Sequence, residues 1–457
     1  TTLTGAVSHS GGTTISAGTL QVGDGGTSGS IAGDITNNAA LAFNRSDALT
    51  FAGDISGTGS FEKLGGGTTT LTGAVSHSGG TTISAGRLQV GDGGTSGSIV
   101  GDITNNAALA FNRSDDVTFA GDISGTGSLQ KLGGGTTTLS GLNTYTGTTT
   151  VDAGILEVAA GGSIATSAAT VNAGGLVVNG TAGAVNVLGG FLGGAGAVGA
   201  TVIGNGGTLS PGNSIGTITV NGQLTFAPGS TYQVEVSPTN ADRTNVTGTA
   251  NLSGATVVAT YEPGSYVAKQ YIIVNATGGV SGEFDGLNGT APAGFKHSLS
   301  YDANNAYLNL VLLMSTGVGQ FSNLNQNQKG VADALSSYFD RTGGIPGAFA
   351  ALTKDGLTAN SGEEGAAAQG AGMAFGSTFI DTIGGPELGG AGTGGGDEGG
   401  ASAYAAERPS PAAERFARLS YAAEELSGSI DAGTRAMRLQ HRLETGYGDG
   451  ARKPERL

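Results

Sequence analysis

Two nearly identical copies of one unit, residues 1–68 and 69–136, open the chain. A third copy starts at residue 137 and stays recognisable up to Val158. Six positions differ between the first two copies: Thr19/Arg87, Ala32/Val100, Ala48/Asp116, Leu49/Val117, Phe61/Leu129 and Glu62/Gln130. A long fixed period is typical of stacked repeat proteins, in which each unit buries its apolar face only against its neighbours. We therefore expect an architecture that grows by adding units.

Short strand-like runs fill the unit and are separated by Gly, Asn, Asp and Ser. Thr19-Leu-Gln-Val22 alternates polar and apolar residues, as a strand with one buried face does. No segment before residue 320 shows a sustained helical period. Gly-Asp-Ile recurs at spacings of 20, 48 and 20, starting at Gly33, Gly53, Gly101 and Gly121. This spacing predicts about three turns of roughly 20 to 24 residues per unit, the size of one turn of a parallel β-helix.

The sequence thus predicts an all-β chain, a right-handed parallel β-helix (β-solenoid) followed by a short α-helical linker and a low-complexity tail. Each strand is expected to pair with its copy one turn away, at about 4.8 Å. A β-sandwich or a propeller is the all-β alternative. Residues 223–312 have longer apolar strands and more aromatic residues than the repeats. Because the end of such a column leaves an open strand edge, we expect this segment to be a cap; a separate small β domain is the alternative.

Composition restricts the classes of function. The chain of 457 residues has 88 Gly, no Cys and a formal charge of −15. The acidic balance excludes nucleic acid as an expected partner, because phosphate binding requires a basic patch. No apolar run reaches the roughly 18 to 20 residues of a membrane helix. The absence of Cys is compatible with a reducing cytoplasm and with an exported chain.

Several segments resemble one known family. Residues 127–158, which include Gly133-Gly-Gly-Thr-Thr-Thr-Leu-Ser-Gly141, resemble the passenger-associated β-strand repeat of autotransporter proteins. Residues 209–222, with Leu209-Ser-Pro-Gly-Asn-Ser-Ile-Gly216, resemble the segment that follows such repeats, and the collinear resemblance extends from residue 1 to about residue 383. It implies a passenger domain of type V secretion, at the cell surface or extracellular, on the outer membrane of a Gram-negative bacterium. It also implies an autochaperone-like role for the cap.

The expected organisation has four regions. Residues 1–222 are β-helix repeats (units 1–68 and 69–136 and a partial unit 137–158), and residues 223–312 are the C-terminal β cap. Residues 313–383 are a helical linker with a helical period from Asn325, and the family places a pore-threading helix at residues 364–383. Residues 384–457 are a Gly-rich linker and a degenerate helical tail. The family ends in a membrane barrel of alternating strands, and we expect it to be missing here through a fragment, a truncation or a frameshift.

Residues that could carry chemistry also have structural interpretations. His9, Asp24 and Ser28 form a trio that faintly resembles a serine protease site, and the second copy repeats it as His77, Asp92 and Ser96. One preorganised constellation makes a catalytic site, and a tandem copy gives no reason for two. The third copy has Tyr145 in place of the His. We expect turn residues at the surface.

Acidic residues suggest two further sites, neither of which we favour. Asp34, Asp54, Asp102 and Asp122 follow Gly in the Gly-Asp-Ile motifs and could stack as calcium ligands, but the denser calcium-binding repeat pattern is absent, so turn formation is preferred. A polysaccharide enzyme built on a β-helix requires a matched acidic pair. The adjacent pairs are Asp115-Asp116, whose counterpart is Asp47-Ala48, and Glu363-Glu364; His9, His77, His297 and His441 do not cluster for metal binding.

We therefore predict a surface-displayed or secreted autotransporter passenger, adhesive or structural, that is not an enzyme. The prediction includes no catalytic, cofactor-binding or metal-binding residue and no cofactor. Expected partners are a protein or glycan on a host or neighbouring cell, together with the outer-membrane barrel and assembly machinery. A β-helix enzyme acting on polysaccharide is the alternative.

Overall fold

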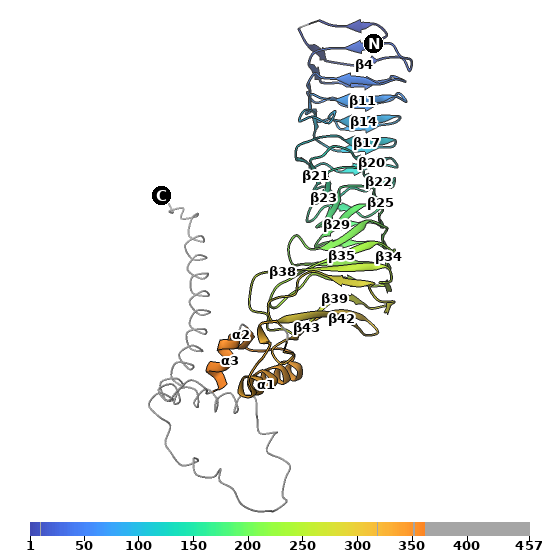
Figure 1. Cartoon of the computed structure of the whole chain (residues 1–457). Coiled ribbons are helices and arrows are strands. Elements are labelled where there is room, and N and C mark those ends of the chain that lie inside the picture. Colours follow the sequence, from blue (N-terminus) through green and yellow to red (C-terminus); the bar gives the residue numbers. More distant parts are fainter. Residues whose placement is uncertain (10, 318, 351, 362–457) are drawn as a thin grey trace, which may run out of the picture. The chain divides into compact units, whose positions relative to one another are not determined.

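A computed structural model describes residues 1–9, 11–317, 319–350 and 352–361, and its main part is a parallel β-solenoid (Figure 1). Three strands form each turn, and strands one turn apart pair in parallel, so the column has three faces. The expected all-β parallel β-solenoid is confirmed. Short strands such as Arg87–Val90 alternate outward polar and inward apolar residues, which is the pattern of a sheet with one buried face.

Face A begins at the N-terminal turn, and between β19 and β24 the isolated bridge of Leu142 with Ser163 takes the place of a strand pair. The strands of face A are β1 (Thr2–Leu3), β4 (Thr19–Val22), β7 (Ala40–Phe43), β10 (Ser60–Lys63), β13 (Thr81–Ile83), β16 (Ile103–Asn105), β19 (Ile123–Ser124), β24 (Ser163–Ile164), β27 (Thr181–Ala182), β30 (Ala197–Val198), β33 (Thr217–Val220), β36 (Arg243–Val246) and β39 (Gln270–Ala276).

Face B contains the longest sheet, of twelve strands. The strands of face B are β2 (Ala6–Val7), β5 (Ser30–Ile31), β8 (Leu49–Phe51), β11 (Thr68–Leu71), β14 (Arg87–Val90), β17 (Ala108–Phe111), β20 (Ser128–Lys131), β22 (Thr149–Val151), β25 (Ala169–Val171), β28 (Val185–Val187), β31 (Thr201–Ile203), β34 (Leu224–Phe226), β37 (Ala250–Asn251) and β40 (Val280–Ser281).

Face C completes each turn. The strands of face C are β3 (Thr13–Ile15), β6 (Ile35–Asn37), β9 (Ile55–Ser56), β12 (Ala74–Val75), β15 (Ser98–Ile99), β18 (Val117–Phe119), β21 (Thr136–Leu139), β23 (Ile155–Val158), β26 (Gly175–Val178), β29 (Gly190–Gly194), β32 (Gly207–Pro211), β35 (Ser230–Val236), β38 (Ala255–Tyr261) and β41 (Gly286–Asn288).

The number of turns per unit is close to the expectation and is not a whole number. The first copy of the unit contains ten strands, β1 to β10, and β11 to β20 are their counterparts in the second copy. Ten strands at three strands a turn give three and one third turns, which agrees with the expected value of about three and shows that it is fractional. Strands do pair one turn away, but a partner is not the counterpart from another copy: β11 pairs with β8 and β14, which have different sequences. The unit therefore ends part-way around the column.

The core is a stack of apolar side chains inside the column. On face A, Phe61 is fully buried and pairs with Leu41 of the preceding turn; on face B, Leu88 is fully buried and pairs with Leu109 of the following turn. Full burial of a side chain of this size stabilises the fold by about 1.5 to 3 kcal/mol. Because each layer rests on the next, stability comes from contacts between neighbouring turns.

The turns widen toward residue 312. On face B, Val185 pairs with Thr201 of the next turn, whereas Ala250 pairs with Val280, which lies almost twice as far along the chain. Strands β35 and β38 have seven residues each, and a hairpin of β42 (Phe295–Tyr301) and β43 (Asn305–Leu312) pairs antiparallel with β39. The antiparallel hairpin covers the edge of face A that β39 would otherwise leave open.

The remaining elements are helical. One compact unit comprises residues 1–312 and 342–351, and includes the single-turn helix α2 (Gly347–Ala350). The described residues of the other unit lie within 313–341 and 352–361 and contain η1 (Gly319–Phe321), most of α1 (Gln326–Thr342) and α3 (Lys354–Ser361). Helix α1 is the helix expected from residue 325 onward. The expected pore helix, the Glu363-Glu364 pair, His441 and the tail lie outside the described residues. None of the described helices is long and apolar enough to cross a membrane.

Candidate functional site

Two identical loops lie at the surface of the first two copies. Each has the sequence Gly-Asp-Gly-Gly-Thr-Ser-Gly, and they span residues 23–29 between β4 and β5 and residues 91–97 between β14 and β15. The middle of each loop is exposed, including Thr27 and Thr95, whereas the flanking glycines are buried. Asp92 is exposed and accepts a hydrogen bond from the backbone N–H of Gly94 at 3.1 Å. The loops therefore offer one carboxylate and two hydroxyls to solvent.

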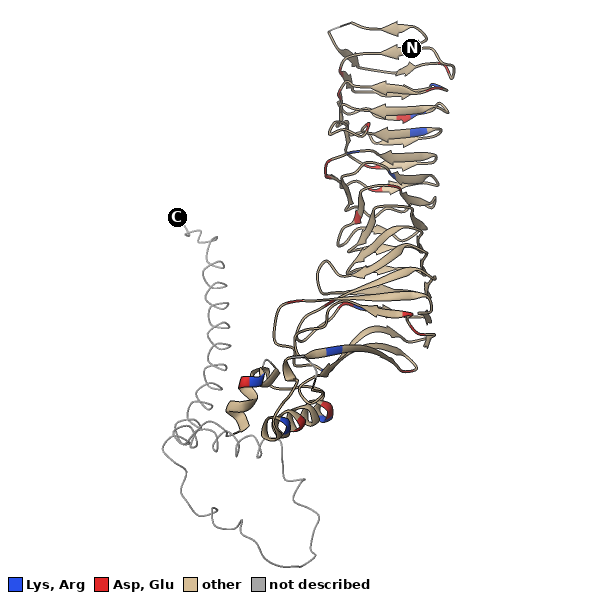
Figure 2. Cartoon of the chain, in the orientation of Figure 1, with Lys and Arg blue, Asp and Glu red and all other residues tan. Residues whose placement is uncertain are grey.

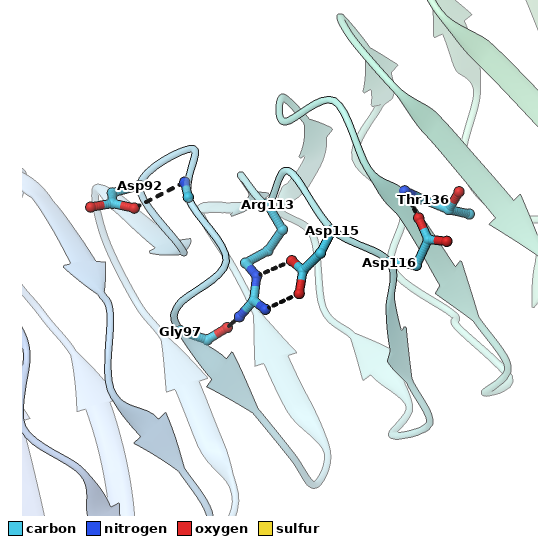
Figure 3. Close-up of polar contacts among 7 residues, drawn as sticks. Asp92, Gly97, Arg113, Asp115, Asp116 and Thr136 are labelled. Carbon is cyan, nitrogen blue, oxygen red and sulfur yellow. Dashed lines mark hydrogen bonds and ion pairs between the residues drawn. The ribbon is translucent and has the colours of Figure 1, made fainter.

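An arginine from the following turn holds each loop in place. Arg113 donates from its guanidinium to both carboxylate oxygens of Asp115, at 2.8 and 2.7 Å, and also to the carbonyl oxygen of Gly97 (Figure 3). Arg45 makes the same contacts to Asp47 and Gly29 in the first copy. Such two-pronged pairing fixes the guanidinium plane. The loops are consequently preorganised by the ion pairs.

The ion pairs also perturb the carboxylates. The hydrogen bond from Arg113 lowers the pKa of Asp115, and that from Arg45 lowers the pKa of Asp47. Asp116, beside Asp115, accepts from the backbone N–H of Thr136 at 2.8 Å (Figure 3). The pair Asp115-Asp116 is thus engaged in two structural contacts.

The Gly-Asp-Ile carboxylates connect successive turns. Asp34 accepts from the backbone N–H of Asp54 at 2.9 Å, and Asp54 accepts from that of Ala74 at 2.7 Å. Asp102 and Asp122 make the corresponding contacts, to the N–H groups of Asp122 and Leu142. The aspartates do stack, but each uses an oxygen to bond the backbone of the next turn. Within the described residues, no group of three or more His, Asp or Glu side chains could hold a metal ion.

The residues of the protease-like trio do not come together. His77 lies between faces C and A, after β12, whereas the loop that carries Asp92 and Ser96 lies between faces B and C. The His77 side chain is buried, and its Nε2 lies 3.0 Å from the carbonyl oxygen of Gly80 and 3.2 Å from Oγ1 of Thr81. Burial lowers the pKa of His77. This position is structural.

The third copy shows what replaces the histidine. Tyr145 is fully buried, and its hydroxyl lies 2.6 Å from Oγ1 of Thr149, the counterpart of Thr81. Burial raises the pKa of Tyr145 to about 12. A different side chain in the third copy therefore makes the same polar contact, to the threonine four residues later.

All five Lys and Arg residues of residues 1–222 are engaged. Lys63 and Lys131 are buried, their Nζ atoms donate to the carbonyls of Ala85 at 3.2 Å and Ala153 at 3.3 Å, and burial lowers both pKa values. Arg87 donates to Oε1 of Gln130 at 2.5 Å, and the other two arginines form the ion pairs above. The same 222 residues contain twelve Asp and Glu, which are red in Figure 2 where Lys and Arg are blue. The exposed charge of this region is therefore acidic.

Comparison with known proteins relates the chain to one family. The sequence model of the Passenger-associated-transport-repeat family matches residues 1–22, 61–90 and 129–158. An adhesin autotransporter, BmaC of Brucella suis biovar 1 (strain 1330), is 38% identical over 183 residues, which are 35% of this chain and 5% of the relative. An extracellular serine protease of Serratia marcescens is 32% identical over 234 residues, 48% of this chain and 20% of the relative. The chain is an autotransporter passenger segment. It spans a small part of each relative.

The passenger segment belongs to a class that is displayed on, or secreted from, the Gram-negative outer membrane. The second and third matched repeats start at residues 61 and 129, one unit apart. Each of these two matches runs from a strand that ends in a buried lysine (β10 or β20) to the strand before the loop position (β14 or β23). The motif therefore encodes the inter-turn contacts of one stretch of column. The buried lysines were missed by sequence reasoning, although their spacing of two from Phe61 and Leu129 places them on the inward face.

The wide end of the passenger segment contains a buried carboxylate. Asp242 is fully buried and accepts from the backbone N–H groups of Gly216 and Glu235, both at 2.8 Å. Burial raises the pKa of Asp242 to about 6, and the two hydrogen bonds offset only part of this effect. Nearby, Tyr232 is fully buried and donates to the carbonyl oxygen of Ile273 at 2.6 Å. These contacts tie successive wide turns together.

Proposed function

We propose that the passenger segment is adhesive and binds a protein or glycan on a host or neighbouring cell. The observation that carries the proposal is the pair of exposed loops, residues 23–29 and 91–97, which are identical in sequence and are each held by an Arg–Asp pair. A preorganised loop favours binding, because little conformational freedom is lost when it contacts a partner. The similarity to an adhesin autotransporter supports the same function.

The proposal extends to the route of export. Autotransporter passengers are associated with an outer-membrane barrel and its assembly machinery, and we propose these as partners of the whole protein. We also propose that residues 223–312 act as the folding-promoting end of the column. Support comes from the wide turns, the antiparallel hairpin and the buried contacts of Tyr232 and Asp242.

An enzymatic passenger is the second candidate, because one relative is an extracellular serine protease. A polysaccharide-degrading enzyme is the alternative that the β-solenoid itself suggests. Against both, His77 makes contacts inside the column, Asp92 makes a contact within its own loop and Asp116 bonds the backbone of the next turn. Adhesion therefore has the stronger support.

The test is a binding assay with cultured epithelial cells, run beside casein hydrolysis and a panel of polysaccharides. We expect cell binding without turnover. The triple variant Asp92→Ala, Thr95→Ala, Ser96→Ala should reduce binding, whereas the control Thr104→Ala, on the exposed side of β16, should not. Turnover of any substrate by the wild-type chain, or binding that is unaffected when both loops carry the triple change, would refute the proposal.

A further inference from the structure

The tandem unit does not bring its copies into line along the column. Strand β4 lies on face A, its counterpart β14 in the second copy lies on face B, and the third counterpart β23 lies on face C. The same shift by one face holds for β1 and β11 and for β3 and β13. It follows from ten strands per unit at three strands per turn.

The exposed loops follow the same rule. Loop 23–29 joins β4 to β5 and therefore lies at the edge between faces A and B. Loop 91–97 joins β14 to β15 and lies at the edge between faces B and C. Because three faces complete each turn and the loops are three and one third turns apart, the loops point about 120° apart around the axis, and are roughly 16 Å apart along it.

The third copy lacks the loop. Only Ala159-Ala-Gly-Gly162 joins β23 to β24, which is shorter than the loop of the first two copies. The second residue after β26, which is the place of Arg45 after β7 and of Arg113 after β17, is Gly180. Loop and arginine are therefore present together in two copies and absent together in the third. This agrees with the arginine having no other task than to hold the loop.

We propose that the 68-residue unit is a screw element, which presents the same exposed loop on successive edges so that one chain contacts partners on different sides of its axis. Two loops stacked on one edge would grip a single flat surface twice. Loops on adjacent edges instead contact two separate cell surfaces, one on each of two sides of the column. The contact with partners on different sides rests on the proposed adhesive function, whereas the rotation of the loops around the axis does not.

The rotation predicts that the direction in which the N-terminal turn faces, relative to the cap, changes with the number of repeat units. Removing residues 69–136 joins residue 68 to residue 137 through the sequence that already follows a unit, so inter-turn contacts keep their type. The N-terminal turn is then about 16 Å closer to the cap and turned by about 120°. Three units restore the original direction, after ten whole turns.

The geometry can be measured directly because the chain has no Cys. The test pair is Thr27→Cys with Thr95→Cys, one in each loop. The control pair is Thr27→Cys with Ser84→Cys; Ser84 is exposed between β13 and β14, on the same edge as loop 23–29 and three turns away. Spin labels on the 457-residue chain report both distances by electron paramagnetic resonance.

We expect roughly 14 Å between the backbones of the control pair and at least roughly 20 Å between those of the test pair, because a face about 13 Å wide separates the two loops. Equal distances in the two pairs would place the loops on one edge and overturn the inference. If a threonine variant fails to fold, Ser28→Cys with Ser96→Cys makes the same comparison. No ligand enters this measurement, so the proposed function can fail without affecting it.

The contact with two sides is tested on beads. Single variants Thr27→Cys and Thr95→Cys are coupled to beads through their cysteine, which turns one loop toward the support, and cultured epithelial cells are added. Both bead types should bind cells, because the other loop faces outward in each. A control preparation is coupled to beads at random positions. If neither cysteine-coupled bead type binds cells while the randomly coupled chain does, contact on two sides is overturned. No binding by randomly coupled chain would instead refute the adhesive function.

Discussion

The three glycines at residues 133–135 provide a sharp test of how the turns stack. A Cβ atom at Gly135 would lie 2.0 Å from the carbonyl oxygen of Asp115 in the preceding turn, and one at Gly133 would lie 2.0 Å from that of Arg113. At Gly134, between them, nothing lies within 4 Å. The same substitution at adjacent positions therefore meets opposite environments.

The expected effects differ in sign. At Gly135 the added methyl group is about 1.5 Å closer than an ordinary contact of roughly 3.5 Å, so neighbouring turns must part. Overpacking of this kind costs on the order of 3 kcal/mol. At Gly134 the methyl group meets no atom and restricts the unfolded chain, which stabilises the fold by about 0.4 to 1 kcal/mol. Gly135→Ala and Gly134→Ala should thus differ by about 4 kcal/mol in free energy of unfolding.

The assay is urea unfolding of the full chain, followed by far-ultraviolet circular dichroism, with limited proteolysis as a second readout. The first copy supplies a replicate, since a Cβ atom at Gly67 would lie 1.9 Å from the carbonyl oxygen of Asp47 and Gly66 is open. Equal unfolding midpoints for Gly135→Ala and Gly134→Ala would refute the stacking of these turns.

Three further predictions concern buried groups and the wide end. Burial lowers the pKa of His77, so the unfolded chain takes up a proton below about pH 6.5 before the folded chain does. The free energy of unfolding should therefore fall on acidification by at most about 1.4 kcal/mol per pH unit. The variant His77→Tyr, which copies Tyr145, should remove this loss, and His9→Tyr at the exposed counterpart should not. Burial raises the pKa of Asp242 to about 6, so the folded state favours the protonated carboxyl, and the free energy of unfolding should fall by at most about 3 kcal/mol as pH rises from about 4 to 6. Asp242→Asn should abolish that slope in pH-dependent urea titrations; a slope that persists would assign it elsewhere. Deletion of residues 223–312 should leave residues 1–222 sensitive to protease, and full resistance would contradict the folding role of the cap.

Much of the fold could be predicted from the sequence because the strand pattern is local. The alternation in Thr19-Leu-Gln-Val22 identified a one-sided strand, and the spacing of successive Gly-Asp-Ile motifs is the spacing of Cα partners between turns, as between Ile35 and Ile55. The fractional turn was missed because the prediction rounds to the nearest whole number of turns. The ratio of the unit length to the Gly-Asp-Ile spacing already contained it.

Burial of identical residues could not be predicted in the same way. His9 and His77 occupy the same place in the unit, yet His9 is exposed and His77 is buried, because their neighbours in the adjacent turns differ. The preceding turn provides Phe61, whose ring lies 6.0 Å from that of His77. The Arg–Asp pairs were likewise hidden, since the loop that each arginine holds lies 16 residues earlier in the chain. Contacts between turns depend on register, which one repeat alone does not reveal.

The central claim, that one unit makes three and one third turns, is tested most directly by disulfide formation at Glu62. In the structure, Glu62 on face A pairs with Thr82, whereas Gln89, the second-copy counterpart of Gln21, lies on face B. Cα partners on neighbouring strands are close enough for a disulfide. Under mild oxidation, the variant with Glu62→Cys and Thr82→Cys should cross-link, and the variant with Glu62→Cys and Gln89→Cys should stay reduced. A cross-link in the second variant and none in the first would contradict the account.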